Sequence, residues 1–447
     1  MRTFRPGPWP LTPVLTASIL LTLGSLFAPR TPADELLQGA PQRIETHRKA
    51  DVTIVVLDAA GQPLRDVRVS VEQTRHRFLF GCNFFQFGRF RDPQDEEAYR
   101  SQFARLFNYA TLAFYWPSYE PQRGQPQHEY TAGAASWCRD HGITTKGHPL
   151  AWNYFEPHWL PDDLQEVRRL QMERIADCVA RMRGLIDIWD TVNEATHYER
   201  EELAARAPKL TRLWTDLGRV PFVNECFRHA RGANDQATLL INDYRVDPPY
   251  AQLITDMTQQ AGERPYDAIG IQSHMHADVW NNEKIWEVCE RFRPFGVPLH
   301  FTELTVLSGA AGWERAQQGQ PWVSTPEGEK QQAQDVVRIY TLLFSHPDVA
   351  AITWWDFADR NAWQNAPAGL LGKDLQPKPA YTALQDLIRN QWWTRAALTT
   401  DAAGRAAFRG FLGDYAVTLR LPAGTELASV RTLQPGPSNV WEIKLEQ

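Results

Sequence analysis

The stretch Ile188-Trp189-Asp190-Thr191-Val192-Asn193-Glu194-Ala195 is a short apolar run that closes on an acid. A second run of the same kind, Pro298-Leu299-His300-Phe301-Thr302-Glu303-Leu304, also carries a glutamate near its end. Both patterns predict buried strands with a carboxyl group at the strand end. Two such carboxyl groups in one cleft suffice to cleave a glycosidic bond, since one protonates the departing oxygen and the other attacks or stabilises the anomeric carbon. The alternative is an ordinary strand-terminal acid in each case.

Apolar or β-branched runs of similar length recur eight times along the chain. They lie at residues 78–85, 109–116, 144–152, 186–195, 238–244, 268–275, 298–304 and 350–357. Polar stretches with helical periodicity, such as residues 164–183 and 329–345, separate them. Unbroken apolar runs that alternate with helices indicate parallel strands buried on both faces. Eight such units predict an α/β fold, a closed (β/α)8 TIM barrel, with Glu194 and Glu303 at the carboxyl ends of its fourth and seventh strands.

Two β-rich segments flank the predicted barrel. Residues 51–72 alternate as two valine- and isoleucine-rich runs around Gly61, which predicts a hairpin, and residues 399–421 form a second β segment. Together they resemble the small β-sandwich of carboxypeptidase-regulatory type. Because two strands alone bury too little surface to be stable, we expect one accessory β-sandwich formed by both ends, with the barrel inserted between them. Two separate β extensions that pack on the barrel are the alternative.

These patterns divide the chain into five parts. We predict a signal peptide at 1–33, a linker at 34–50, the two halves of the sandwich at 51–75 and 394–447, and the catalytic barrel at 76–393. Arg2 and Arg5 precede an apolar stretch over residues 11–28, which small residues follow. That pattern is typical of a secretory signal, so we expect a secreted or periplasmic protein without stable membrane insertion after cleavage. A permanent membrane anchor is the alternative.

Composition narrows the class of partner. The net charge is -6 and no long Lys/Arg run occurs, so no nucleic acid is expected as a partner. The five cysteines lack CxxC spacing, so they predict neither a zinc site nor a disulfide framework. His274 and His276 have a spacing that a metal site can use, but no cysteine or third ligand stands beside them. We therefore expect neither a metal nor a cofactor.

Several residues at the predicted strand ends are candidates for substrate binding. Trp152, Trp355 and Trp363 lie at or just beyond strand ends, where flat indole faces can stack on pyranose rings. His148 ends the third strand, and Gln272 and His274 alternate along one face of the sixth. Strict alternation would place Asn193 and Glu194 on opposite faces, so they can share a site only where the strand ends or bulges.

Four motifs resemble glycoside hydrolase family 10, the endo-β-1,4-xylanases. They are Gly147-His148-Pro149-Leu150-Ala151-Trp152, the run Trp189 to Ala195, Gly270-Ile271-Gln272-Ser273-His274, and Thr302-Glu303-Leu304, in the family's order. The resemblance implies that Glu194 is the general acid/base and that Glu303 is the nucleophile, which His274 keeps ionised. It also implies retention of anomeric configuration, with the carboxyl groups about 5 Å apart. Asn193 would then bind the sugar's 2-hydroxyl, and the substrate would be a plant cell-wall polysaccharide, xylan or a related β-glycan.

The sequence also departs from the family at three places. Thr111-Leu112-Ala113-Phe114-Tyr115-Trp116 stands where the family has a glutamate-asparagine pair and a lysine-tryptophan pair, Asn153 replaces a histidine, and Thr305 replaces an acid. These changes predict altered recognition of the sugar away from the cleavage point. Two further readings stay open: a family 10 enzyme with altered specificity, and a catalytically silent carbohydrate-binding or scaffold protein. The presence of both glutamates with Asn193 and His274 favours an endo-1,4-β-xylanase-like glycoside hydrolase.

Overall fold

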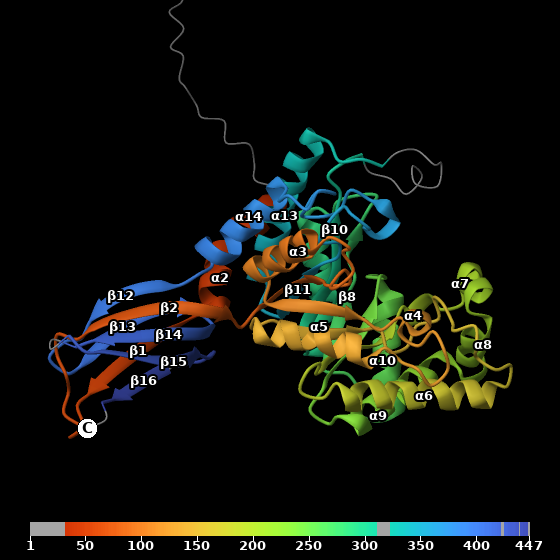
Figure 1. Cartoon of the computed structure of the whole chain (residues 1–447), viewed down its shortest axis with the longest axis horizontal. Helices are drawn as coiled ribbons and strands as arrows, with labels where there is room; N and C mark the ends of the chain where they lie inside the picture. Colours follow the sequence, from red (N-terminus) through yellow and green to blue (C-terminus); the bar gives the residue numbers. More distant parts are fainter. Residues whose placement is uncertain (1–31, 311–321, 422–423, 438, 446–447) are drawn as a thin grey trace, which may run out of the picture.

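The computed structural model describes residues 32–310, 322–421, 424–437 and 439–445. They form a barrel and, beside it, a smaller pair of β-sheets (Figure 1). The predicted signal peptide, apart from its last two residues, lies outside the described residues. Within them, no helix has both the length and the apolar character needed to cross a bilayer.

Eight parallel strands form the barrel. They are β3 (Leu79–Asn83), β4 (Tyr109–Ala113), β5 (Thr144–His148), β6 (Ile188–Asn193), β7 (Thr238–Asp243), β8 (Ala268–Ile271), β10 (Leu299–Val306) and β11 (Val349–Trp354). Each pairs with the next, and β11 pairs with β3, which closes the cylinder. The short β9 (His274–Met275) extends the edge of β10. The structure thereby confirms the predicted (β/α)8 fold, because each expected apolar run overlaps one barrel strand.

Helices surround the barrel. The longer ones are α3 (Pro93–Leu106), α5 (His128–Asp140), α6 (Leu164–Arg181), α8 (Pro208–Leu217), α9 (Arg219–Ala233), α10 (Pro248–Ala261), α11 (Asn282–Phe292), α13 (Pro326–Ser345) and α14 (Pro379–Asp386), and the shorter ones are α4 (Trp116–Tyr119) and α7 (Glu201–Arg206). Local capping explains where the two predicted helices begin. Asp163 accepts the N–H of Glu166 at 2.8 Å at the start of α6, and Thr325 accepts the N–H of Gly328 at 3.0 Å at the start of α13.

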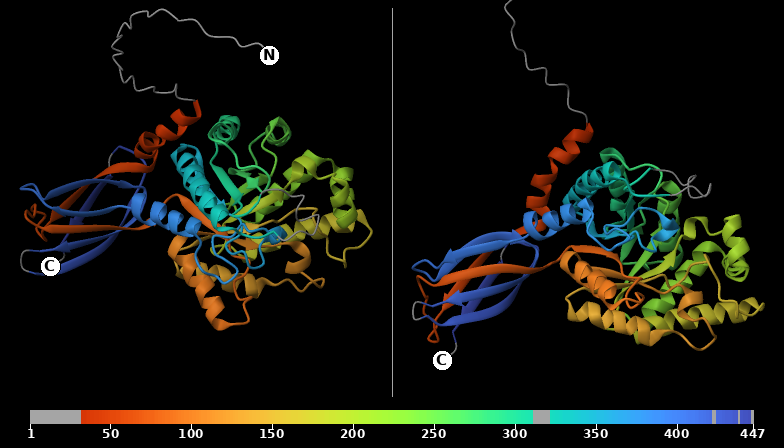
Figure 2. Two further views of the ribbon diagram at one scale, coloured as in Figure 1. Left: turned by 90° about the horizontal axis from the view of Figure 1, so that it is seen from above. Right: turned by 45° about the horizontal axis from the view of Figure 1, so that its top comes forward.

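The two ends of the chain build one β-sandwich. One sheet has the order β13 (Arg405–Phe411), β1 (Lys49–Leu57), β16 (Asn439–Lys444); the other has the order β12 (Arg395–Thr399), β2 (Arg68–His76), β14 (Gly413–Arg420), β15 (Glu426–Leu433). The alternate apolar residues of these strands meet in a core separate from that of the barrel, formed by Val52, Ile54, Val56, Val69, Val71, Tyr415, Val417, Leu419, Trp441 and Ile443 among others. Figure 2 shows this sandwich beside the barrel in both further views. The accessory β-sandwich is therefore confirmed.

The predicted hairpin over residues 51–72 is wrong. Gly61 does form the expected turn, with φ at +82°, and Leu64 donates its N–H to the carbonyl of Val56 at 2.9 Å. The chain then crosses to the other sheet, where β2 pairs with β12 and β14 instead of with β1. Alternation in both runs is satisfied because each strand buries one face in the shared core between the two sheets.

Residues 34–50, predicted as a linker, include α2 (Ala40–Arg48) and most of α1 (Pro32–Gln38), which begins at the end of the predicted signal peptide. Ala40 and Ile44 are buried, and α2 packs on α13. The guanidinium of Arg48 donates to the carbonyl oxygens of Phe344 at 2.6 Å and Val349 at 2.7 Å. These tertiary contacts order a segment whose own sequence carries little helical periodicity.

All five cysteines are buried and unbridged.

Candidate active site

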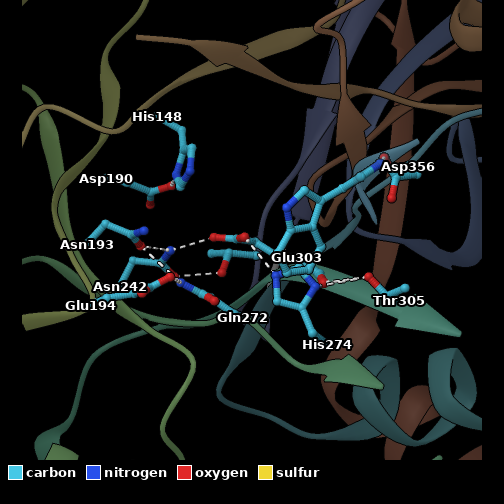
Figure 3. A network of polar contacts seen from close by, with 12 residues as sticks. His148, Asp190, Asn193, Glu194, Asn242, Gln272, His274, Glu303, Thr305 and Asp356 are labelled. Carbon is cyan, nitrogen blue, oxygen red and sulfur yellow. Dashed lines mark hydrogen bonds and ion pairs between the residues drawn. The ribbon is translucent and has the colours of Figure 1, made fainter. Parts of the chain in front are cut away.

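A cavity of about 490 Å³ opens at the carboxyl ends of the barrel strands. Glu194, Gln272, His274 and Glu303 line it, together with Trp152, Trp355 and Trp363. Figure 3 shows the polar members of this group directed toward one another around Glu303. The fold has therefore brought seven of the nine predicted site residues to one cavity; His148 and Asn193 stand behind it.

The end of β6 explains how Asn193 and Glu194 serve the same site. The pairing of β6 with β7 shifts register between Asp190 and Val192, and Glu194, the residue after the strand, has a left-handed backbone with φ at +56°. This break in alternation turns both side chains toward the cavity side. The structure thus has both a bulge and a strand end here, either of which would allow the two side chains to share a site.

Asn242, at the end of β7, links the two glutamates through Asn193. Its Nδ2 lies 2.7 Å from Oδ1 of Asn193 and 2.8 Å from Oε1 of Glu303. Gln272 Nε2 lies 3.1 Å from the same Asn193 oxygen and 3.2 Å from Oε1 of Glu194. Gly270 leaves room for this arrangement, because a Cβ there would lie 2.3 Å from Oδ1 of Asn242.

Glu303 lies in a setting that favours its ionised form. His274 Nε2 lies 3.0 Å from Oε2 of Glu303, and since a carboxylate only accepts, this nitrogen is the donor. Burial alone would raise the pKa of Glu303, but nearby His148, the His274 hydrogen bond and Lys146 outweigh it and lower the pKa. Thr305 Oγ1 lies 3.1 Å from Nδ1 of His274 and so holds the orientation of that ring.

Glu194, unlike Glu303, lies in a setting that favours its protonated form. Burial raises its pKa to about 7, against the nearby charge of Arg200, while the negative charges of Asp243 and Glu303 add to the increase. An ion pair joins Oε2 of Glu194 to Nη2 of Arg200. The two glutamates therefore differ in the direction of their pKa shifts, as an acid and a nucleophile must.

Beneath the cavity, Asp190 forms a buried charge cluster. Its Oδ2 lies 2.6 Å from Nζ of Lys146 and 2.8 Å from Nδ1 of His148, and all three side chains are almost fully buried. Asp190 fixes the His148 ring behind the cavity. The His148 ring is thereby held 5.4 Å from that of Trp355, which lines the cavity.

One cavity wall is aromatic. Trp152 stacks on Tyr154 with ring centroids 4.3 Å apart, and Phe155, which is 49% exposed, packs edge-on against Tyr154. Tyr115, in the stretch that departs from the family, also lines this wall. The rings of Trp355 and Trp363, which also line the cavity, contact that of His274. Within the described residues, no group of three or more His, Cys, Asp or Glu side chains has metal-binding geometry.

The model of glycosyl hydrolase family 10 matches residues 77–387. This chain belongs to glycosyl hydrolase family 10. Among curated relatives, it is 25% identical to the anti-sigma-I factor RsgI6 of Acetivibrio thermocellus over 86% of this chain but 46% of that protein, so it spans less than half of that relative. It is 24% identical to endo-1,4-beta-xylanase B of Thermotoga neapolitana, over 70% of this chain and 88% of that protein. The solved xylanase 10B of Thermotoga maritima shares the fold at 23% identity and a TM-score of 0.59, over 70% and 96% of the two chains.

As a family 10 member, the chain contains site residues that sequence reasoning missed. Asn242 is one of them, because nothing in the spacing of the sequence revealed its two acceptors, Asn193 and Glu303. Arg200 lies six residues after Glu194, in a loop whose sequence shows no recognisable motif. Asp356 follows Trp355 and lines the cavity; its Oδ1 accepts the N–H of Trp363 at 3.0 Å, and burial raises its pKa to about 7. Asn153, by contrast, points away and donates to the carbonyl of Tyr198 at 2.7 Å.

Proposed function

We propose that this protein is a retaining β-glycoside hydrolase that cleaves xylan by double displacement, most simply as an endo-β-1,4-xylanase. The observation that carries the proposal is that Glu194 and Glu303 line one cavity with pKa values shifted in opposite directions. A proton donor and an ionised nucleophile on the same cleft are what the reaction requires.

In the first step, Glu303 attacks the anomeric carbon while Glu194 gives its proton to the leaving oxygen. The bond to that oxygen breaks, and a covalent bond forms between the sugar and Glu303. Asn193 supports this step: its amide oxygen accepts from Asn242 and Gln272, whereas its Nδ2 has no hydrogen-bond partner among the described residues. That buried N–H is suited to the sugar's 2-hydroxyl.

In the second step, ionised Glu194 takes a proton from water, and the resulting hydroxide attacks the anomeric carbon. The bond to Glu303 breaks, and its carboxylate is restored. Formation of the sugar ester removes the negative charge of Glu303, so Glu194 loses one of the groups that raise its pKa and can now act as the base. Two inversions give net retention.

Xylan is proposed because the named relatives include endo-1,4-beta-xylanases. The aromatic wall of Tyr115, Trp152, Tyr154 and Phe155 offers stacking surfaces with few hydrogen-bonding groups. We therefore infer a substrate bound more by ring stacking than by polar contacts on that side. The N-terminal pattern supports action outside the cytoplasm, and N-terminal sequencing of protein recovered from the periplasm or medium tests that location.

The deciding experiment measures sugar release from xylan, mixed-linkage glucan and aryl β-xylosides by wild type, E194A and E303A. We expect release from xylan by the wild type and near-complete loss in both variants. Proton NMR of the first product gives its anomeric configuration: a β-anomer supports double displacement, and an α-anomer contradicts it.

A carbohydrate-binding protein without catalysis is the second candidate. One observation favours it: a relative that covers most of this chain is named as an anti-sigma-I factor and not as an enzyme. Isothermal titration with xylohexaose beside the release assay separates the two. Binding without release by the wild type would establish this second candidate.

A further inference from the structure

The acid/base candidate has a cationic partner close to it in sequence. Glu194 follows β6, and Arg200, six residues later, occupies the position just before α7 without a side-chain hydrogen bond to that helix. Nη2 of Arg200 forms an ion pair with Oε2 of Glu194, while Oε1 of Glu194 accepts from Nε2 of Gln272 at 3.2 Å. Both carboxylate oxygens therefore face N–H donors.

Charged and titratable groups from three elements surround this pair. Asp243 and Tyr244 come from the end of β7, Glu303 comes from β10, and Arg200 belongs to the loop after β6. The guanidinium of Arg200 lies 5.0 Å from the Tyr244 ring centroid. Arg200 is thus the cationic group among the named neighbours of Glu194, and the others are the carboxyl groups of Asp243 and Glu303 and the phenol of Tyr244.

Arg200 is also incompletely bound. Its side chain is 24% exposed, and its buried Nε has no hydrogen-bond partner among the described residues. An arginine held by one carboxylate and one aromatic face can rotate away at lower cost than one held in a bidentate fork. The contact with Glu194 can therefore open and close.

The two steps of the reaction make opposite demands on this contact. The first step needs the proton on Glu194, which a guanidinium at Oε2 opposes. The second step needs Glu194 as a carboxylate, which the same guanidinium stabilises.

We propose that Arg200 is a positioning residue of the reaction, which withdraws from Oε2 of Glu194 for proton donation and pairs with the carboxylate while Glu194 acts as base. This inference rests on the proposed double displacement. In the first step the proton moves from Glu194 to the leaving oxygen, and Arg200 then compensates the new negative charge. In the second step the proton moves from water to Glu194, and the ion pair opens again.

Aryl β-xylobiosides with poor and good leaving groups test this. With a poor leaving group, formation of the sugar ester is rate-limiting and depends on proton donation by Glu194. With a good leaving group, hydrolysis of that ester is rate-limiting. For R200Q, we expect the basic limb of kcat/KM on the poor substrate to move up by about one pH unit or more. On the good substrate, kcat should fall about 10-fold, a part of the roughly 10²- to 10⁴-fold that a positioned base contributes.

Controls separate this role from a structural one. R200K keeps the charge, so its basic limb should stay near that of the wild type. R245Q is a matched control, because Arg245 has a similar exposure of 30% and also pairs with a single carboxylate, that of Asp247; its pH profile should not change. R200A serves as a second neutral variant, and thermal unfolding of each variant identifies those that fold.

The outcomes are distinct. A lower kcat in R200Q with an unmoved basic limb overturns the inference, because a merely structural role gives that result. Unchanged behaviour of R200Q beside an active wild type also overturns it and leaves the proposed function standing. Absence of hydrolysis by the wild type on every substrate overturns both. A shifted limb that R200K restores supports the inference.

Discussion

Asn242 places one amide nitrogen between Asn193 and Glu303, 2.7 Å from Oδ1 of the first and 2.8 Å from Oε1 of the second. Thr302 Oγ1 donates to Oδ1 of Asn242 at 2.6 Å and so fixes which end of the amide faces Glu303. Asn193 and the proposed nucleophile Glu303 are therefore positioned by a single side chain.

Replacing Asn242 by aspartate should impair the nucleophile. N242D removes the donor and puts a second carboxylate beside Glu303, so the pKa of Glu303 rises and the acidic limb of kcat/KM moves to higher pH. Loss of a charge-assisted hydrogen bond costs about 1.5–3 kcal/mol, roughly a 10- to 100-fold drop in kcat/KM. T302V, which frees the amide without adding charge, should show a smaller drop and an unmoved acidic limb. Equal profiles for N242D and wild type would contradict this role.

Activity should be bell-shaped in pH, with Glu194 responsible for the basic limb. The acid must be protonated, so kcat/KM is lost as pH rises through about 7, the pKa to which burial raises Glu194. It is lost at the acidic end as pH falls through the lowered pKa of Glu303. E194Q should abolish the basic limb.

Asp356 provides the control for that assignment, since burial also raises its pKa to about 7. In D356N the basic limb should remain where it is in the wild type. A basic limb that disappears in D356N but persists in E194Q would assign the acid to Asp356 instead.

The exposed ring of Phe155 should contribute to binding of long substrates. F155S removes a stacking surface worth about 0.5–1.5 kcal/mol, so KM for xylohexaose should rise roughly 2- to 10-fold. KM for a small aryl xyloside, which reaches only the cleavage point, should change less. V430S, at a position 71% exposed on the sandwich, is the control that changes neither constant. Equal effects on the long and small substrates would place Phe155 outside a distal binding surface.

The buried cluster around Asp190 should dominate local stability. D190N leaves Lys146 charged and uncompensated in the core, which costs about 3–5 kcal/mol in the free energy of unfolding. Urea denaturation measures this. The exposed pair Arg139 and Asp140 offers the comparison, since D140N should change the free energy of unfolding by less than about 0.5 kcal/mol. Similar midpoints for the two variants would disprove the assignment.

Local patterns of residues are enough to predict the barrel and the positions of Glu194 and Glu303 within it. Apolar runs such as residues 238–244 predict strands because burial on both faces is a local property of composition. Glycine and alternation also predicted a turn at Gly61 and β-structure at both ends. They did not predict that β1 and β2 enter different sheets, because alternation is the same for a hairpin and for two strands that share a core.

The opposite pKa shifts of the two glutamates, by contrast, arise from contacts between distant segments of the chain. Asn242 contacts Glu303, Arg200 contacts Glu194, and Thr305 contacts His274. No periodicity in the sequence encodes such side-chain pairs. Burial and neighbouring charge determine a pKa, and both depend on which segments meet in space. The helices over residues 34–50 have the same origin, since Arg48 is held by carbonyl groups about 300 residues further along the chain.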